Sequence, residues 1–155
     1  LEKVKGSALV GLKYAGPFDS LEAQNIAGGY PFTNEKLKKD GITAVDCHKV
    51  IDGGKDNIGN DIVVAGEGTG IVHMATGCGA IDNKIGKKNN LVEIAPLNDE
   101  AKYLEGFGFL TGKTATSEST RDEIIQYLKE NNIDIKSSGA GNTCKLYSTL
   151  YEVVL

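Results

Sequence analysis

Apolar residues along the chain occur in short runs separated by clusters of glycine, asparagine and aspartate, a pattern typical of strands joined by turns. The strand-like runs are residues 8–14, 42–51, 62–65, 71–75, 91–95 and 145–155. Because these runs are short and turn signals are frequent, we predict a mainly β fold with peripheral α-helices and a β-barrel-like core. A parallel α/β fold is the alternative, but it would need a helix after most strands, which the sequence does not predict.

Two segments carry helix signals. Residues 121–131 follow a capping-box pattern, with a hydroxyl at Thr120 and a carboxylate at Glu123, and their apolar residues recur on one face. Residues 82–90 are predicted to form a short helix that begins at Asp82 and ends at two asparagines. Both helices would lie outside the β core.

Two polar segments are predicted to lie at the surface. Residues 36–40 form a charged run, for which a solvated face is the simplest role. Residues 52–61 are rich in glycine, asparagine and aspartate, which predicts a long exposed hairpin loop. Its aspartates lack the spacing of a calcium-binding EF-hand loop, so we expect them to stabilise turns. A further turn is predicted at residues 137–142.

Length and charge limit the function classes. The 155 residues suit one domain, since a domain takes about 100–200 residues. A net charge of −4 argues against general nucleic-acid binding through phosphate neutralisation, although capture of an RNA end needs only a few contacts. The three cysteines are odd in number, which favours free thiols in a reducing cytoplasm. There is no secretory signal or membrane-length apolar run, and a chain that begins with Leu1 is expected to be excised from a larger protein.

The densest chemical signal is the glycine-rich stretch at residues 66–82, in which a strand would present His73 and the following turn Asp82. Its glycines, in a G-x-G-x-G spacing, resemble a dinucleotide-binding turn. That motif requires a helix directly after the glycines, and here a strand-like run follows. A glycine-rich hairpin with an incidental histidine is the simplest alternative.

Metal and nucleophile schemes are less well supported. A zinc site could combine His73, Cys78, Cys47 and His48, but the chain has no C-x₂-C pair. Cys47 and His48 would also point to opposite faces of a strand. A Cys–His hydrolase built on Cys78 and His73 has no recognisable orienting residue, and a serine triad has no G-x-S-x-G elbow. We therefore expect no metal and no cofactor.

The glycine-rich stretch and its flanking segments together resemble the editing domain inserted into isoleucyl-tRNA synthetases, which has counterparts in the valyl and leucyl enzymes. The motif residues are Gly68-Thr69-Gly70-Ile71-Val72-His73, then Ala75, Gly77, Gly79 and Asp82. The resemblance continues at residues 6–14, 17–19, 86–88, 95–97 and 105–113, and it covers most of the chain to about residue 135. It implies a single editing-like domain spanning residues 1–155.

The resemblance also implies residue roles. Asp82 would bind the α-ammonium of a misattached amino acid, since a carboxylate in a partly dry pocket gains from a cation. His73 would lie beside the substrate side chain and exclude isoleucine by size. Thr69, with the backbone of Gly68 and Gly70, would line the attacking water and the terminal ribose. The implied catalytic positions are Asp82, His73 and Thr69, and the implied substrate-binding positions are Gly68, Gly70, Ala75 and Gly79.

The implied reaction is hydrolysis of the ester of valyl-tRNA(Ile) by water, with no protein nucleophile. One methylene is worth only about 1–3 kcal/mol in an attractive pocket, which is why a second, size-excluding site is needed. The implied partners are the aminoacylated 3′ end of tRNA and the remainder of a parent synthetase, in the cytoplasm and away from any membrane.

The sequence departs from the family pattern in three places. Thr76 stands where a proline is usual, and the acidic pair that ends the motif is reduced to Ile81-Asp82. The family's upstream threonine-rich segment with its Trp-Thr pair is missing, and the chain has no tryptophan; residues 111–120 are threonine-rich but misplaced. The chain is then either a fragment lacking part of its pocket or a catalytically reduced tRNA-end-binding or interaction module. In either case His73 could be a core histidine.

Overall fold

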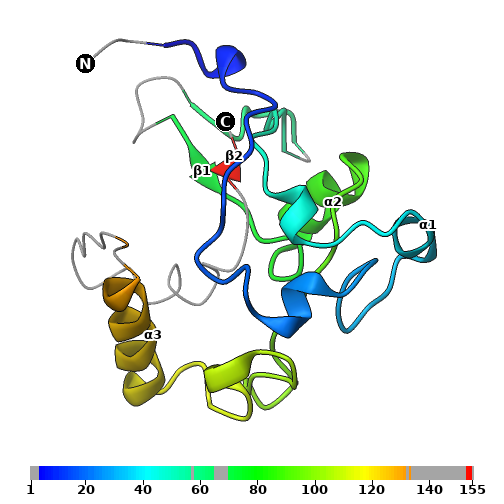
Figure 1. The fold of residues 1–155 in the computed structure, drawn as a ribbon. Coiled ribbons are helices and arrows are strands. Elements are labelled where there is room, and N and C mark those ends of the chain that lie inside the picture. Colours follow the sequence, from blue (N-terminus) through cyan, green and yellow to red (C-terminus); the bar gives the residue numbers. More distant parts are fainter. Residues whose placement is uncertain (1–3, 57, 65–69, 132, 134–152, 155) are drawn as a thin grey trace.

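The computed structural model describes residues 4–56, 58–64, 70–131, 133 and 153–154 and consists of short helices and long irregular segments around one core (Figure 1). The α-helices are α1 (Glu35–Lys39), α2 (Ala80–Lys88) and α3 (Glu118–Glu130), and the strands are β1 (Val72–His73) and β2 (Val153–Val154). Single 3₁₀ turns occupy Gly6–Ala8, Glu22–Asn25, Val45–Cys47 and Gly108–Leu110. Among the described residues, no helix combines the length and apolar character needed to cross a bilayer.

The predicted mainly β, barrel-like core is wrong. In the described part of the chain the sheet consists of β1 and β2, which pair antiparallel over two residues each. Several segments with strand-like sequences approach one another at single residue pairs instead: Lys13 with Lys49, Tyr30 with Ile94, Leu97 with Tyr103, and Lys102 with Thr114. A strand is stabilised by a continuous ladder with a neighbour, so β-type sequence that meets its neighbour only once remains irregular.

The prediction of a strand at residues 42–51 fails for a local reason. The Asp46 carboxylate accepts hydrogen bonds from the Thr43 amide at 2.9 Å and from its hydroxyl at 2.8 Å. These hydrogen bonds hold the pKa of Asp46 below its ordinary value, and the bond from the Thr43 amide has the larger effect. Such side-chain bonds offer the backbone an alternative to a ladder, and here they fix the 3₁₀ turn Val45–Cys47.

The other strand predictions have mixed outcomes. The run 71–75 contains β1, but only over two residues. Residues 8–14 begin in a 3₁₀ turn and pair once, and residues 91–95 also pair once although their apolar side chains are buried. Residues 62–64 form no strand, and Ala65 lies outside the described residues. Of residues 145–155 only β2 is described, and the turn predicted at 137–142 lies outside the description.

The predicted C-terminal helix is confirmed as α3, which begins three residues earlier than expected. Its N-cap position is Ser117, and Thr120, predicted as the cap, is buried in the first turn at 2% exposure. Lys129 lies in the last turn, where the helix dipole favours a cation. The apolar periodicity therefore located the helix, while the capping-box pattern misplaced its start.

Helix α3 is fixed to the rest of the protein by aromatic stacking. The Tyr127 ring stacks on Phe18 at 5.3 Å and on Phe109 at 5.0 Å between centroids. The Tyr127 hydroxyl donates to the carbonyl of Pro17 at 3.2 Å. Tyr side chains at least partly buried usually combine such apolar packing with a hydrogen bond. The hydrogen bond of Tyr127 links residues 110 positions apart in the chain.

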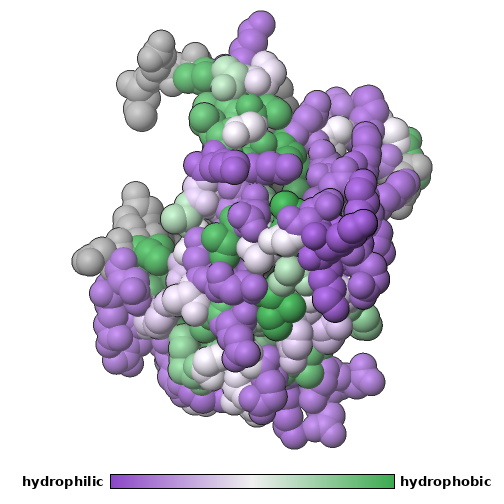
Figure 2. Space-filling model, turned by 45° about the vertical axis from the view of Figure 1, so that its right-hand side comes forward, coloured by the Kyte–Doolittle hydropathy of each residue, from purple (hydrophilic) through white to green (hydrophobic). Residues whose placement is uncertain are grey.

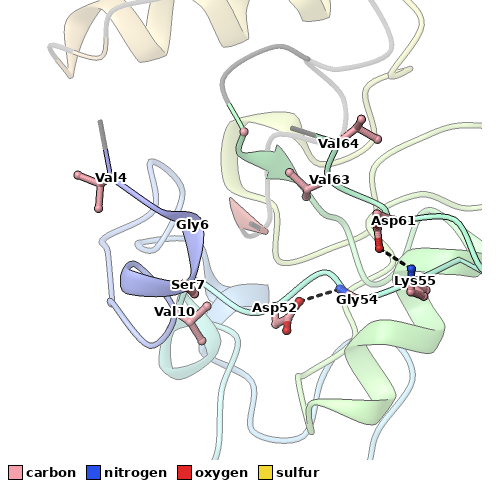
Figure 3. Close-up of a pocket in the computed structure, with 11 residues that line it drawn as sticks. Val4, Gly6, Ser7, Val10, Asp52, Gly54, Lys55, Asp61, Val63 and Val64 are labelled. Carbon is pink, nitrogen blue, oxygen red and sulfur yellow. Dashed lines mark hydrogen bonds and ion pairs between the residues drawn. The ribbon is translucent and has the colours of Figure 1, made fainter. Parts of the chain in front are cut away.

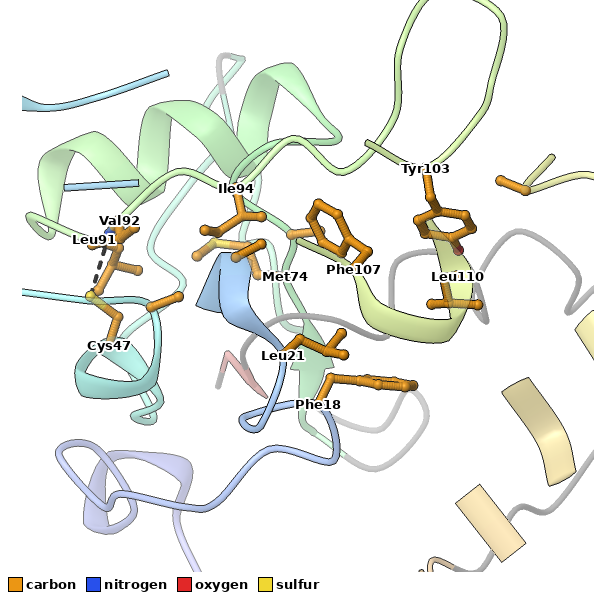
Figure 4. Close-up of a cluster of buried hydrophobic side chains, with 14 of the residues drawn as sticks. Phe18, Leu21, Cys47, Met74, Leu91, Val92, Ile94, Tyr103, Phe107 and Leu110 are labelled. Atoms are coloured by element: carbon orange, nitrogen blue, oxygen red, sulfur yellow. Dashed lines mark hydrogen bonds between the residues drawn. The ribbon is translucent and has the colours of Figure 1, made fainter. Parts of the chain in front are cut away.

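The core gathers side chains from the irregular segments as well as the helices (Figure 4). Its largest fully buried hydrophobic members are Phe107, Met74, Ile94, Leu110, Ile124 and Val92. Cys47 belongs to this core, and its sulfur accepts the amide of Val92 at 3.3 Å. Hydrophobic packing rather than sheet hydrogen bonding thus holds the segments in place.

The loop at residues 52–61 confirms the prediction of turn chemistry. The carboxylate of Asp52 accepts the amide of Gly54 at 2.9 Å, and that of Asp56 accepts the amides of Ile58 and Asn60, each at 2.9 Å. These are Asx-type turns, in which an aspartate satisfies backbone donors ahead of it. A single antiparallel pair, Lys55 with Asp61, closes the hairpin.

A buried histidine that pairs with a half-buried aspartate lies apart from the glycine-rich stretch. His48 is 3% exposed, its Nδ1 is 3.0 Å from Oδ1 of Asp19, and its ring stacks on Tyr14 at 5.3 Å. Burial lowers the pKa of His48, and the Asp19 carboxylate acts in the opposite direction. Within the described residues its Nε2 has no hydrogen-bond partner, so a proton there would be buried without an acceptor.

This burial predicts acid destabilisation. Because the pKa of His48 is lower in the folded state, the unfolded chain takes up the proton at a higher pH. The free energy of unfolding should be unaffected by His48 above about pH 6.5 and should fall as the pH drops from there toward the lowered folded value, with a slope of at most about 1.4 kcal/mol per pH unit. Urea denaturation at several pH values should show a shallower decline for His48→Gln. The matched variant His73→Gln should keep the His48 contribution, and an undiminished slope in His48→Gln would contradict the prediction.

Candidate functional site

The candidate site is the turn that joins β1 to α2. His73 ends β1, and Asp82 lies in the first turn of α2, whose N-cap is Gly79. The sequence had predicted that Asp82 opens this helix; instead it lies inside the first turn and reaches back, where its Oδ2 accepts the amide of Ala75 at 3.0 Å. One carboxylate therefore ties the start of α2 to the segment that follows β1.

A second set of hydrogen bonds holds the same turn. The Asn83 side chain donates to the carbonyl of Thr76 at 2.9 Å, and the Thr76 hydroxyl donates to the carbonyl of Val92 at 2.9 Å. Thr76 is 2% exposed, so its hydroxyl needs this acceptor. Thr76, which stands where the resemblance predicts a proline, thus connects the turn to the segment after α2. Sequence reasoning missed Asn83, although an Asx residue in a first helical turn is a recognisable signal.

His73 and Asp82 interact electrostatically. Desolvation by neighbouring protein lowers the pKa of His73, and the negative charge of Asp82 acts in the opposite direction. The His73 residue keeps solvent-exposed surface, so the imidazole is desolvated on one side and open on the other. A neutral imidazole beside a carboxylate can accept or donate a hydrogen bond near neutral pH. The turn therefore brings together two of the residues predicted to form the site.

Glycines allow the turn to pack closely. A Cβ at Gly77 would overlap the carbonyl group of Ile94, and one at Gly86 would lie 2.6 Å from Cγ2 of Thr76. At Gly79 the nearest atoms to a Cβ would be those of the Asp82 carboxyl group, at an ordinary 3.5 Å. Gly77 and Gly86 are thus required by packing, whereas Gly79 is not crowded and adjoins the carboxylate.

Two hollows flank the turn. A shallow depression of about 350 Å³ is lined by residues 76–80, Asn83 and Glu93, at the N-terminal end of α2. A larger hollow of about 600 Å³ includes Gly70, with a positive φ of 75°, and valines such as Val10 and Val63 (Figure 3). His73 and Asp82 line neither of these two hollows; among the described residues His73 is exposed and Asp82 is half-buried.

The remaining predicted positions have different surroundings. Ala75 is buried, at 2% exposure, and contributes its amide to Asp82 rather than a free surface. Thr69 and Gly68 lie outside the described residues. The structure thus brings together His73, Asp82, Ala75 and Gly79, and it places Gly70 in the neighbouring hollow.

The zinc alternative is not supported by the described residues. Among them there is no group of three or more histidine, cysteine, aspartate or glutamate side chains able to hold a metal ion. Cys47 is in the core against Val92, and His48 is paired with Asp19. The exposed Cys78 lies in the turn after β1. The prediction that Cys47 and His48 lie on opposite faces of a strand is also wrong. Cys47 ends a 3₁₀ turn, and both Cys47 and His48 are buried.

Comparison with known proteins identifies relatives over most of the chain. The isoleucine–tRNA ligase of Sulfolobus acidocaldarius is 34% identical over 131 residues, which is 84% of this chain and 10% of that protein. The isoleucine–tRNA ligase of Methanocaldococcus jannaschii is 36% identical over 129 residues, or 83% of this chain and 10% of that protein. That of Aquifex aeolicus is 34% identical over 105 residues, or 68% of this chain and 9% of that protein.

These matches cover only a part of the relatives, since the chain spans about a tenth of their length. No family model matches the chain, and no solved structure matches it. All three relatives are isoleucine–tRNA ligases from different organisms, so the relationship does not depend on a single protein. The chain is therefore homologous to a segment of isoleucine–tRNA ligases and represents an aminoacyl-tRNA synthetase-related domain.

Proposed function

We propose that this chain is an editing domain of an isoleucine–tRNA ligase and hydrolyses the ester of valyl-tRNA(Ile). The observation that carries the proposal is the nearness of His73, at the end of β1, to Asp82, in the first turn of α2, within a segment shared with isoleucine–tRNA ligases. The partners are the aminoacylated 3′ end of tRNA and the rest of a synthetase, in the cytoplasm. No cofactor or metal takes part.

The roles follow from the chemistry of the substrate. An aminoacyl ester carries an α-ammonium beside the reacting carbonyl, and the second oxygen of Asp82 is left to receive it while Oδ2 holds the Ala75 amide. His73 lies on the neighbouring strand and limits the size of the amino acid side chain. Water attacks the carbonyl carbon of the ester, and the bond from that carbon to the ribose oxygen breaks. The ribose oxygen takes up a proton that the water gives up and leaves as a hydroxyl group. Thr69, Gly68 and Gly70 line the water and ribose, and Gly79 borders the ammonium site.

The proposal is tested by incubating the chain with valyl-tRNA(Ile) and measuring loss of the ester against the spontaneous rate. Faster loss with the chain supports an editing hydrolase. Isoleucyl-tRNA(Ile) is the matched control and should be hydrolysed more slowly. If neither ester is lost faster than spontaneously, the chain has no deacylase activity of its own.

A second candidate is a tRNA-end-binding module without hydrolysis. The observation that favours it is the exposure of His73 and the half-exposure of Asp82, because a solvent-exposed site does not exclude bulk water from the reaction. Binding of aminoacyl-tRNA without ester loss would support this module over the enzyme.

His73→Ala is predicted to change selectivity rather than overall rate. Removing the imidazole enlarges the space beside the substrate, so isoleucyl-tRNA(Ile) should become a substrate. A size-based discrimination of about 1–3 kcal/mol corresponds to roughly 10- to 200-fold, and the valyl-to-isoleucyl ratio of kcat/KM should fall by up to that factor. A ratio unchanged in an active, folded variant would identify His73 as a structural residue.

A further inference from the structure

The basic residues of the chain are not evenly distributed. Helices α1 and α2 together hold six lysines: Lys36, Lys38, Lys39, Lys84, Lys87 and Lys88. The same two helices hold only two acidic residues, Glu35 and Asp82. Since the whole chain carries a net charge of −4, the rest of the molecule is more acidic than the total suggests. All six lysines are exposed.

Among the described residues, four of these six lysines have no carboxylate partner. Lys36, Lys38, Lys39 and Lys88 make no ion pair within the part of the chain that the structure describes. The Lys87 ammonium is 3.7 Å from Glu93, but its side chain is 69% exposed, so the pair is weak. By contrast, three lysines elsewhere, Lys55, Lys102 and Lys113, each pair with a carboxylate. The charges of Lys36, Lys38, Lys39 and Lys88 are therefore left for an external anion.

The two helices lie on the same side of the molecule. The segment before α1 is bonded to the segment after α2, since Tyr30 donates to the carbonyl of Glu93 at 3.0 Å and Ala95 donates to that of Tyr30 at 2.8 Å. Gly29 allows this approach, because a Cβ there would lie 2.5 Å from the Glu93 carbonyl oxygen. Both helices occupy the right-hand side of Figure 1, and Figure 2 shows hydrophilic residues covering the face that this side presents.

This lysine surface, defined by the six lysines of α1 and α2, begins at the candidate site. Glu93 pairs with Lys87 and also lines the shallow depression at the N-terminal end of α2. Asp82 belongs to the first turn of α2, and Lys87 and Lys88 to its last turn. A helix of nine residues is about 13 Å long, which is a short span along a nucleic-acid backbone.

We propose that the lysine surface binds the phosphate backbone of the tRNA end whose aminoacyl group enters the site; this rests on the proposed function. The 3′ end of a tRNA is a polyanion with one charge per nucleotide, and several unpaired ammonium groups gain affinity by releasing its counterions. The surface reads no sequence, because phosphate contacts position a nucleic acid without specifying bases. The net negative charge of the chain then limits binding elsewhere on the molecule.

The test is the salt dependence of binding to an unacylated tRNA(Ile) transcript, measured by fluorescence anisotropy. The triple variants are Lys36→Gln/Lys38→Gln/Lys39→Gln and Lys84→Gln/Lys87→Gln/Lys88→Gln. Each lost contact should reduce the slope of log affinity against log salt by about 0.7–0.9, so a triple variant should lose about two units of slope and at least 10-fold in affinity at 50 mM salt. The control Lys55→Gln/Lys102→Gln/Lys129→Gln removes three exposed lysines elsewhere and should change the slope by less than half as much.

The two proposals fail in different ways. The proposal of the lysine surface is wrong if both helix variants bind tRNA with the same salt slope as the unmodified chain. It is also wrong if the control variant loses as much slope as the helix variants, even if ester hydrolysis is observed. Absence of salt-dependent binding by the unmodified chain also overturns it. Loss of slope in the helix variants together with no ester hydrolysis would leave the lysine surface supported and the hydrolase proposal refuted. Circular dichroism should show the same fold for all variants, because every substituted side chain is exposed.

Discussion

Asp82→Asn is expected to lower kcat/KM for valyl-tRNA(Ile) by about 10- to 150-fold while changing the free energy of unfolding by less than about 1 kcal/mol. The amide oxygen of asparagine can still accept the Ala75 amide that Oδ2 of Asp82 accepts at 3.0 Å. The negative charge that would bind the substrate ammonium is lost, and a charge-assisted contact is worth about 1.5–3 kcal/mol. The small stability change comes from the weaker interaction with the helix dipole.

Asp82→Ala separates the charge of Asp82 from its role as a hydrogen-bond acceptor when it is compared with Asp82→Asn. It removes both the charge and the acceptor, so it should show the same kinetic loss and an additional stability loss of about 1–3 kcal/mol from the unpaired Ala75 amide. Asp99→Asn, at an exposed position in a loop, controls for a general charge effect. Full activity in Asp82→Asn would mean that Asp82 is only a structural acceptor. Kinetics and urea denaturation of the three variants separate the two roles.

Gly77→Ala is expected to destabilise the protein by about 3 kcal/mol or more. The new Cβ would overlap the carbonyl group of Ile94, which is backbone and cannot move aside as a flexible side chain can. Ile94 is fully buried, so a shift of its backbone would disturb the packing of the core. Overpacking costs about 1–3 kcal/mol when side chains can adjust, and more when they cannot. For a chain of this size the melting temperature should fall by about 6–12 °C.

Gly79→Ala is the matched control in the same turn. Its Cβ would meet nothing closer than 3.5 Å, and its φ of −144° is accessible to alanine. Alanine is a poorer N-cap than glycine, so a cost of at most about 1 kcal/mol is expected. Equal melting temperatures for the two variants would show that the turn does not pack against Ile94 as described.

The sequence predicted the features that depend on neighbouring residues. Helices α2 and α3 were located to within three residues at their ends, because apolar periodicity and terminal residues are local signals. Asn89, one of the two asparagines expected to end α2, is its C-cap. Asp52 and Asp56 of the 52–61 loop accept hydrogen bonds from backbone amides within four residues, as turn chemistry requires.

The strands were predicted less well because a strand depends on a distant partner. The run 42–51 has the alternation of a half-buried strand, yet a local Thr43–Asp46 contact competes with pairing. The run 91–95 is as buried as a central strand, but pairs with Tyr30 only once. Hydrophobic pattern thus reported which segments are buried, and could not report whether their backbones form a ladder.

Of the candidate site, the sequence predicted the nearness of His73 and Asp82, but not what holds them. The Thr76–Val92 bond joins residues 16 positions apart, and the contact of Gly77 with Ile94 is seen only in three dimensions. The Asp19–His48 pair likewise links two segments with no local signal. Each of these depends on tertiary packing, which residue spacing does not encode.

Whether Asp82 and His73 share one site is tested most directly by NMR titration of the imidazole protons. The chain has only two histidines, so both can be assigned by substitution. The pKa of each should lie below the ordinary value of about 6.5, because burial lowers the pKa of His48 and of His73. In Asp82→Asn the pKa of His73 should fall further, since the carboxylate that opposes the burial effect is gone, while that of His48 should not change. An unchanged or higher His73 pKa in folded Asp82→Asn would contradict a shared site.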